Sequence, residues 1–265
     1  MKKPSLKSFS ISISYLMIVI IFISAIINLY EKRGKLKNFI NSKKEVPVEK
    51  TPEKIDKYLV SEEDNYWAKE IMNGGYILHF RHAVRDKWVD IQMYDVLESD
   101  VHNNGKDESR YAENDYFANA VCLNDRGKIQ AKAIGESLNY IAFPIGVVYS
   151  SVSCRARQTA ELAFGGYDKL YRILMYKGAY NEDDKNRVNK LIELYSNINI
   201  DKGKNAIISS HGKVISCEMF INDKCPESLS LGEGGFYILR QSEKGLLYEY
   251  KFHNFYEFNK VFYNR

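Results

Sequence analysis

From Ser61 onward, hydrophobic positions recur along the chain with two alternating spacings. Stretches whose apolar residues lie three or four apart, as on one face of a helix, alternate with short runs rich in β-branched and aromatic residues. The first spacing predicts helices over 61–72, 125–140, 155–164 and 183–197, and a further helix after Gly212. The second predicts strands over 76–80, 145–150, 205–209, 236–239 and 246–252.

This alternation predicts an α/β fold, because a strand, a helix and a second strand in succession build a parallel pair. We expect a three-layer α/β/α sandwich with a mostly parallel central sheet, closed by the last two strands. Ligands of such sheets bind at the carboxyl ends of the strands. The residues that directly follow each strand are therefore the first candidates for a site.

The N-terminal sixty residues have a different pattern. Residues 11–30 contain no charge and match the ~20 residues that a helix needs to cross a bilayer. A cleaved signal peptide is the alternative, but its apolar core is normally ~7–15 residues long and precedes a site of the A-x-A type. Basic residues flank both ends, so the orientation in the membrane stays open. We expect a single-pass membrane protein held in the lipid bilayer through residues 11–30.

The chain therefore divides into three parts. We expect a membrane anchor over 1–30, a charged linker over 31–60, and one domain over 61–265 that can bury a full core. Inside that domain, the interval 84–120 separates the first strand from the next helix and far exceeds the usual connection of ~4–6 residues. We interpret it as a lid insertion over the carboxyl edge of the sheet.

The formal net charge of +4 comes from the N-terminal part. Residues 1–60 hold 12 Lys and Arg against 5 Asp and Glu, which leaves 26 against 29 in the rest of the chain. Because the domain has no basic excess, we expect no nucleic-acid partner.

Cysteine and histidine spacings indicate neither a metal nor a cofactor. No H-E-x-x-H or C-x-x-C motif occurs. We interpret the four cysteines as buried thiols, which leaves the redox compartment open; they are Cys122, Cys154, Cys217 and Cys225.

Basic residues and histidines follow three of the predicted strands. The first strand ends in Arg81-His82, the second leads into "YSSVSCRARQTAE", and the third into "SSHGKVIS". Two arginines and two histidines should therefore converge at one edge of the sheet. Guanidinium groups bind phosphoryl oxygens through paired hydrogen bonds, and a neutral imidazole is a nucleophile near neutral pH. The pattern predicts phosphoryl transfer through a phosphohistidine.

These residues resemble the histidine phosphatase superfamily, also called phosphoglycerate mutase-like. Its R-H-G signature corresponds to Arg81-His82-Ala83, its S-S-x-x-x-R-A-x-Q-T-A block to residues 150–160, and its S-H-G to Ser210-His211-Gly212. Its L-T-x-x-G-x-x-Q-A block corresponds to residues 123–131. Four blocks in the right order are specific, although each block alone is a weak signal.

The resemblance implies roles for four residues of the site. His82 is the nucleophile that attacks phosphorus in line with the departing oxygen. Arg81, Arg155 and His211 form the phosphate site around it and stabilise the negative charge of the transition state. Water then hydrolyses the phosphohistidine.

The proton donor for the leaving group is less closely defined by the resemblance. In the mutase-like branch it is a glutamate after the second block, which implies Glu182, with Asp183 and Glu233 as alternatives. Arg85 follows the nucleophile in a loop and is a candidate for substrate binding, although a solvated loop position explains it equally well.

The leading hypothesis is a membrane-tethered phosphomonoesterase for a phosphorylated small molecule or a phosphopeptide. The alternatives are a phosphoglycerate mutase-like phosphotransferase and a catalytically inactive phosphate-binding module. Mutases usually carry S-x-x-N directly after R-H-G, where this chain has Arg85 and Trp88. An inactive module is disfavoured because all four residues of the phosphate site are present. Acidic residues within 84–120 favour a substrate with one accessible phosphate.

Overall fold

A computed structural model of the chain describes residues 60–86, 121–176, 183–226 and 228–263. The predicted anchor, nearly all of the predicted linker and most of the predicted lid insertion lie outside these ranges. Within the described ranges, we find no helix that combines the length and the apolar character needed to cross a bilayer.

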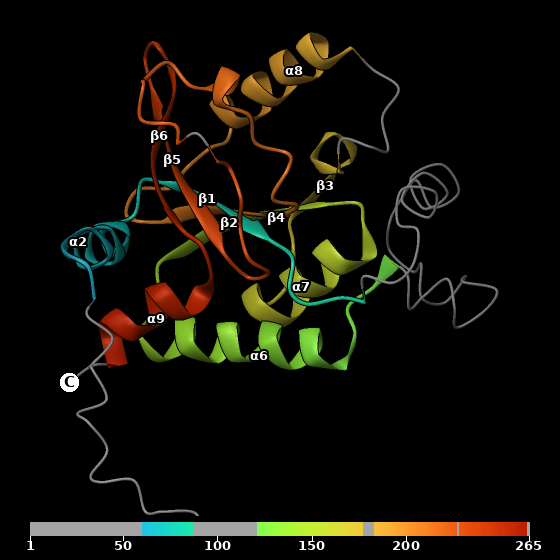
Figure 1. Cartoon of the computed structure of the whole chain (residues 1–265), viewed down its shortest axis with the longest axis vertical. Coiled ribbons are helices and arrows are strands. Elements are labelled where there is room, and N and C mark those ends of the chain that lie inside the picture. Colours follow the sequence, from blue (N-terminus) through green and yellow to red (C-terminus); the bar gives the residue numbers. More distant parts are fainter. Residues whose placement is uncertain (1–59, 87–120, 177–182, 227, 264–265) are drawn as a thin grey trace, which may run out of the picture. The chain divides into compact units, whose positions relative to one another are not determined.

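A mixed sheet of six strands forms the centre of the described part of the chain (Figure 1). The strand order is β3-β2-β4-β1-β5-β6, in which β1 to β4 run parallel and β5 and β6 run antiparallel to their neighbours. The predicted α/β class with a mostly parallel sheet is thus confirmed. The strands are β1 (Ile77–Arg81), β2 (Ile145–Ser151), β3 (Lys169–Tyr171), β4 (Asn205–Ser210), β5 (Phe236–Ser242) and β6 (Gly245–Phe252).

Helices cover both faces of this sheet. Figure 1 shows α6 (Asp125–Tyr140), α7 (Cys154–Phe164) and α9 (Phe255–Tyr263) on one face and α8 (Asp184–Ser196) on the other. A further helix, α2 (Glu62–Glu70), joins the first group, because Lys260 of α9 contacts Asp64 of α2 at 3.4 Å. The described ranges also contain three short 3-10 helices: η1 (Ile71–Asn73), η2 (Arg172–Leu174) and η4 (Cys217–Met219).

The two faces of the sheet belong to two separate hydrophobic clusters. Leu78 and Phe80 of β1 pack with α6, α7 and α9, whereas Ile77 packs with the side chains of α8. On β4, Ile207 packs in the cluster of Leu78 and Phe80, whereas Ile208 packs in the cluster of Ile77. Because successive side chains of a strand point to opposite faces, His79 and Arg81 lie on the face that carries α8.

Three strand ends place their polar residues at one level of the sheet. Arg81 is the register partner of Ser210, and Ser209 is the partner of Ser150 on β2. The His82 amide continues the first pairing, since it donates to the Ser210 carbonyl at 2.9 Å. The three sequence blocks that follow β1, β2 and β4 therefore meet at the carboxyl edge, as the strand pattern predicts.

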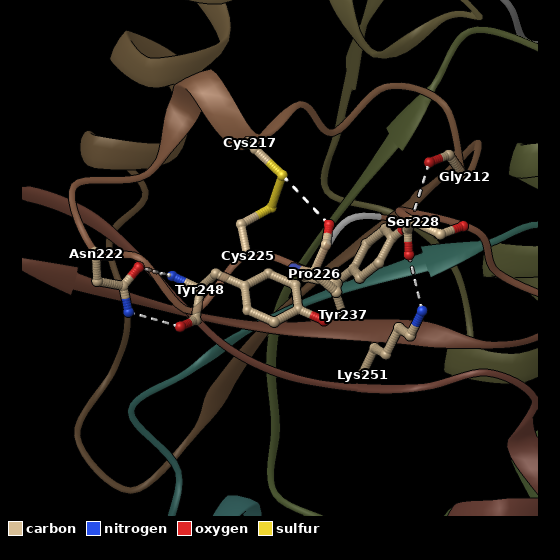
Figure 2. The surroundings of a disulfide bond; sticks show 9 residues. All are labelled: Gly212, Cys217, Asn222, Cys225, Pro226, Ser228, Tyr237, Tyr248 and Lys251. Carbon is tan, nitrogen blue, oxygen red and sulfur yellow. Dashed lines mark hydrogen bonds between the residues drawn. A yellow bond between two sulfur atoms is a disulfide. The ribbon is translucent and has the colours of Figure 1, made fainter.

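The helix predicted after Gly212 is wrong. Val214 and Ile215 are buried without helical structure, and only the short η4 follows them. The chain then lies along β6, where the Ile221 amide donates to the Leu246 carbonyl at 3.0 Å. Asn222 pairs with both backbone groups of Tyr248 (Figure 2). Bonds to β6 thus satisfy polar groups that a helix would have satisfied internally.

The interpretation of the cysteines as thiols is also wrong. All four form disulfides, Cys122 with Cys154 and Cys217 with Cys225 (Figure 2 shows the second pair). The Cα atoms of the two pairs are 4.8 and 5.6 Å apart, within the range that a disulfide requires. Cys122 and Cys154 are separated by 32 positions, so their proximity follows from the packing of α7 and not from a local motif.

Candidate active site

A cavity of about 330 Å³ opens at the carboxyl ends of β1 and β4. Four of the described residues that line it are cationic and none is acidic, so the cavity suits an anion. The lining residues are Arg81, His82, Arg85, Arg155, Tyr176, His211, Gly212, Lys213, Leu229, Ser230 and Leu231.

His82 lies just after the end of β1 and is only 4% exposed. Its Nδ1 is 2.8 Å from the carbonyl oxygen of Ala83. A carbonyl can only accept, so Nδ1 carries the proton and Nε2 carries the lone pair. Burial lowers the pKa of His82 well below its usual 6.5, and the charge of Arg155 lowers it further. His82 is therefore a neutral imidazole with a nucleophilic Nε2.

His211 follows β4 and is held between two side chains. Arg155 Nη2 donates toward its Nδ1 at 3.4 Å, and its Nε2 is 3.3 Å from the hydroxyl of Ser151. This arrangement puts the proton on Nε2. Burial lowers the pKa of His211 well below 6.5, followed by the charges of Arg155 and His82. The His82 and His211 rings meet edge to face, with centroids 5.2 Å apart.

Arg155 occupies the first turn of α7 and is 1% exposed. Its Nη1 donates to the Val121 carbonyl at 3.4 Å. The next residue, Cys122, is bonded to Cys154, and the Leu123 amide donates to the Gln158 side chain at 2.8 Å. Segment 121–123 is therefore attached to the start of α7 by three links that surround Arg155.

Arg81 and Arg85 approach the cavity from the end of β1 and the loop after it. Arg81 donates to the Leu231 carbonyl through Nη1 and lies 3.4 Å from the Glu233 carboxylate through Nη2. Arg85 Nη1 donates to the Asp86 carbonyl at 2.7 Å. Both guanidinium groups are thus held by neighbouring backbone while they line the cavity.

Residues of the 123–131 block hold the loop that carries His82. Asn124 caps α6 by accepting from the Gly127 amide at 2.9 Å. Gly127 approaches Val84 so closely that a Cβ there would lie 1.9 Å from the Val84 carbonyl oxygen, which explains the glycine. Gln130 accepts from the Val84 amide at 3.0 Å and donates to the Glu233 carbonyl at 2.9 Å.

A hydroxyl of α7 links this loop to Arg155. The Ala83 amide donates to Thr159 Oγ1 at 3.0 Å, and the same hydroxyl donates to the Arg155 carbonyl at 2.7 Å. Ser209 of β4 also contacts this turn, through a 2.7 Å bond to the Ala156 carbonyl. The positions of His82, Arg155 and His211 are therefore coupled through backbone contacts.

Residues 112–175 match the family model described as histidine phosphatase superfamily (branch 1). This stretch of the chain is similar to the histidine phosphatase superfamily, as the sequence blocks predict. The matched stretch contains the 123–131 and 150–160 blocks, while the Arg81-His82 pair precedes it and His211 follows it. No curated protein matches the chain significantly.

Several solved structures are similar to this chain. The protein histidine phosphatase SixA complexed with tungstate is 16% identical, with a TM-score of 0.41, over 66% of this chain and 95% of that chain. Rv3214 from Mycobacterium tuberculosis is 14% identical, with a TM-score of 0.40, over 66% of this chain and 95% of that chain. YhfR from Bacillus stearothermophilus is 14% identical, with a TM-score of 0.40, over 65% of this chain and 94% of that chain.

Five of the six site residues named from the sequence line one cavity: Arg81, His82, Arg85, Arg155 and His211. The sixth, Glu182, lies outside the described residues. Of its two alternatives, Asp183 is exposed directly before α8, and Glu233 lies beside Arg81.

Sequence reasoning did not assign Tyr176, Lys213 or residues 229–231 to the site. Tyr176 and Lys213 face one another across the cavity rim, with Lys213 Nζ 5.8 Å from the Tyr176 ring. Lys213 directly follows the S-H-G block, and this position was the available signal. Residues 229–231 reach the cavity because the chain first runs alongside β6 near Ile221 and then turns back toward the site. No local sequence pattern indicates this path.

Proposed function

We propose that this chain is a phosphomonoesterase that hydrolyses a phosphate ester through a phosphohistidine on His82. The observation that carries the proposal is the arrangement of Arg81, Arg155 and His211 around a buried, neutral His82 whose Nε2 has a lone pair. Arginine cations placed beside a nucleophile stabilise a group whose negative charge grows in the transition state.

In the first step, His82 Nε2 attacks the phosphorus atom and the bond from phosphorus to the ester oxygen breaks. The leaving oxygen takes a proton from a general acid. We assign this role to Glu182, with Glu233 and Asp183 as the alternatives. Arg81, Arg155 and His211 hold the three equatorial oxygens of the phosphoryl group.

In the second step, a water molecule attacks the phosphorus atom and the nitrogen–phosphorus bond breaks. The general acid, now deprotonated, receives the proton from water. Inorganic phosphate leaves and His82 returns to its neutral form. The cycle needs no metal or cofactor, because arginine charges supply the electrostatic stabilisation.

The substrate that we propose is a phosphorylated small molecule or a phosphopeptide with one accessible phosphate. Arg85 and Lys213 add positive charge at the rim, while Tyr176 and two leucines provide apolar surface. Such a mixed rim suits the organic part of a phosphate ester.

We further propose that residues 11–30 tether the enzyme to a membrane, with the catalytic domain on the oxidising side. The uncharged twenty-residue stretch supports the tether. The two disulfides support a location of the domain on the oxidising side of the membrane, because disulfides persist outside the reducing cytosol. The basic residues on both flanks of the stretch do not favour either orientation.

The test uses the full chain in detergent and a panel of phosphorylated sugars, lipid head groups, peptides and nucleotides. We expect release of inorganic phosphate from at least one substrate. Alkaline quenching during turnover should trap an acid-labile phosphoryl group on His82, and His82→Ala should abolish both the adduct and turnover.

Each alternative gives a different result. A phosphotransferase passes the phosphoryl group to a second substrate molecule in preference to water. An inactive module binds inorganic phosphate without turnover of any substrate. A folded His82→Ala variant that works at the parental rate would rule out the proposed mechanism.

A further inference from the structure

A second buried histidine lies on β1, three positions before the nucleophile. His79 has no exposed surface and faces the α8 side of the sheet, outside the lining of the cavity. Its Nδ1 is 2.5 Å from the hydroxyl of Tyr195 on α8, and its Nε2 is 2.9 Å from the carbonyl oxygen of His211. His79 therefore joins a helix on one face of the sheet to a residue of the phosphate site.

The chemistry of these groups determines the direction of both hydrogen bonds. The His211 carbonyl can only accept, so His79 Nε2 must donate. Burial lowers the pKa of His79 to about 4, so the ring is neutral and its Nδ1 accepts. Burial also raises the pKa of Tyr195 well above 10, which keeps its hydroxyl protonated and able to donate.

We propose that His79 and Tyr195 are positioning residues that fix the His211 backbone, and through it the His211 ring, for phosphoryl transfer. The inference rests on the proposed function. The His211 carbonyl also accepts from the Val214 amide at 3.2 Å, which closes the turn after β4. The bond from His79 holds this turn against the sheet, while Arg155 and Ser151 hold the ring.

The surroundings argue against a role for His79 in packing alone. Its neighbours along β1, Leu78 and Phe80, and the flanking Ile77 are fully buried apolar residues. An apolar side chain at position 79 would fill the same space without the desolvation of two ring nitrogens. It would, however, leave both the His211 carbonyl and the Tyr195 hydroxyl without this partner.

The position of Tyr195 is itself fixed. It lies one residue before the end of α8, where its carbonyl accepts from the Gln241 side chain of β5 at 2.7 Å. Gln241 also donates to the Ile198 carbonyl at 2.9 Å. The hydroxyl that orients His79 therefore comes from a helix end that is bound to the sheet.

Three variants of the full chain separate hydrogen bonding from packing. Tyr195→Phe removes only the hydroxyl, His79→Gln keeps an amide N–H that can reach the His211 carbonyl, and His79→Leu removes every donor. The matched control is Tyr76→Phe, which deletes a hydroxyl that donates to Glu70 at 2.9 Å, next to the opposite end of β1.

We expect Tyr195→Phe to lower kcat/KM about tenfold and His79→Leu about a hundredfold, with His79→Gln between His79→Leu and the parent. Tyr76→Phe should stay within about a factor of two of the parent. Affinity for inorganic phosphate, measured by calorimetry, should fall in the same order. If activity instead follows thermal stability in all four variants, or if Tyr195→Phe matches Tyr76→Phe, the proposal is overturned.

The tautomer gives a test that does not depend on turnover. In protein with ¹⁵N-labelled histidines, the His79 signal, assigned by its loss in His79→Gln, should show a proton on Nε2 and none on Nδ1. A proton on Nδ1 contradicts the proposal even in an active enzyme. If the parent turns over no substrate, the proposed function fails, while the tautomer and the order of phosphate affinities still decide the role of His79.

Discussion

Three histidines among the described residues are buried as neutral rings. Burial is the main cause of the lowered pKa of His79, His82 and His211, and Arg155 contributes for the last two. In the unfolded chain each ring titrates at its ordinary value near 6.5. Below that pH the unfolded state binds protons that the folded state does not, so folding stability must decrease as the solution is acidified.

We predict a steep loss of stability between pH 6.5 and 5. All of the stability linked to these rings is present above pH 6.5. As the pH falls below 6.5, each ring lowers the free energy of unfolding by about 1.4 kcal/mol per pH unit. This loss continues until the pH reaches the pKa of that ring in the folded protein. For His79 this window extends to about pH 4. Urea unfolding of the full chain at several pH values measures the slope.

Single variants assign this slope to its source. His79→Gln should reduce the slope by about 1.4 kcal/mol per pH unit. An unaltered slope in His79→Gln would mean that His79 is not held neutral in the folded state.

At the scale of single residues, the sequence identified site residues that directly follow strands. It did not identify residues whose role depends on contacts between distant parts of the chain. Arg81, His82 and His211 could be named because the carboxyl ends of parallel strands meet at one edge. His79 could not be singled out, since an alternating strand pattern shows which face a side chain takes but not its hydrogen-bond partners. Lys213 was missed because the helix predicted after Gly212 gave it no place at the cavity.

At the scale of elements, the start of α7 depends on its connection to segment 121–123. The disulfide from Cys122 to Cys154 and the bond from Arg155 to Val121 meet there. Both cysteines are buried. The disulfide from Cys217 to Cys225 offers a comparison, because it closes a short loop along β6 in which Cys217 is exposed.

We predict that the two disulfides contribute differently to activity. Loop-closure entropy alone assigns about 4 kcal/mol of stability to the first disulfide and about 3 kcal/mol to the second. Cys122→Ser/Cys154→Ser should in addition lower kcat/KM at least about tenfold, since it loosens Arg155. Cys217→Ser/Cys225→Ser should lower stability and reduce kcat/KM much less. Equal kcat/KM in the two double variants, at a temperature where both are folded, would contradict a special role for the first disulfide.

Element prediction succeeded where one face of a segment is polar. The predicted helix 125–140 and the observed α6 coincide, because its apolar residues face the core and a capping asparagine marks its start. The helix α9 was missed, since its aromatic residues are as typical of strands as of helices. The 3-residue strand β3 is too short to show any period.

At the scale of the whole molecule, we predict a membrane protein whose catalytic domain contains no free thiol. The full chain should sediment with membranes and resist carbonate extraction, because residues 11–30 are long enough to span. After denaturation without reductant, its cysteines should not react with a maleimide. Reduction before labelling supplies the positive control.

Two results would contradict this arrangement. A soluble protein whose N-terminus begins after residue 25 would identify the apolar stretch as a cleaved signal peptide. Labelling of all four cysteines without reductant would place the domain in a reducing compartment.

The loop along β6 also bears on aggregation. A strand at the border of a sheet exposes backbone groups that can pair with a strand of another molecule. In this chain the Leu246 carbonyl and both backbone groups of Tyr248 are already bonded to Ile221 and Asn222. The segment closed by Cys217 and Cys225 thus occupies part of this border, and these groups cannot template the addition of a foreign strand.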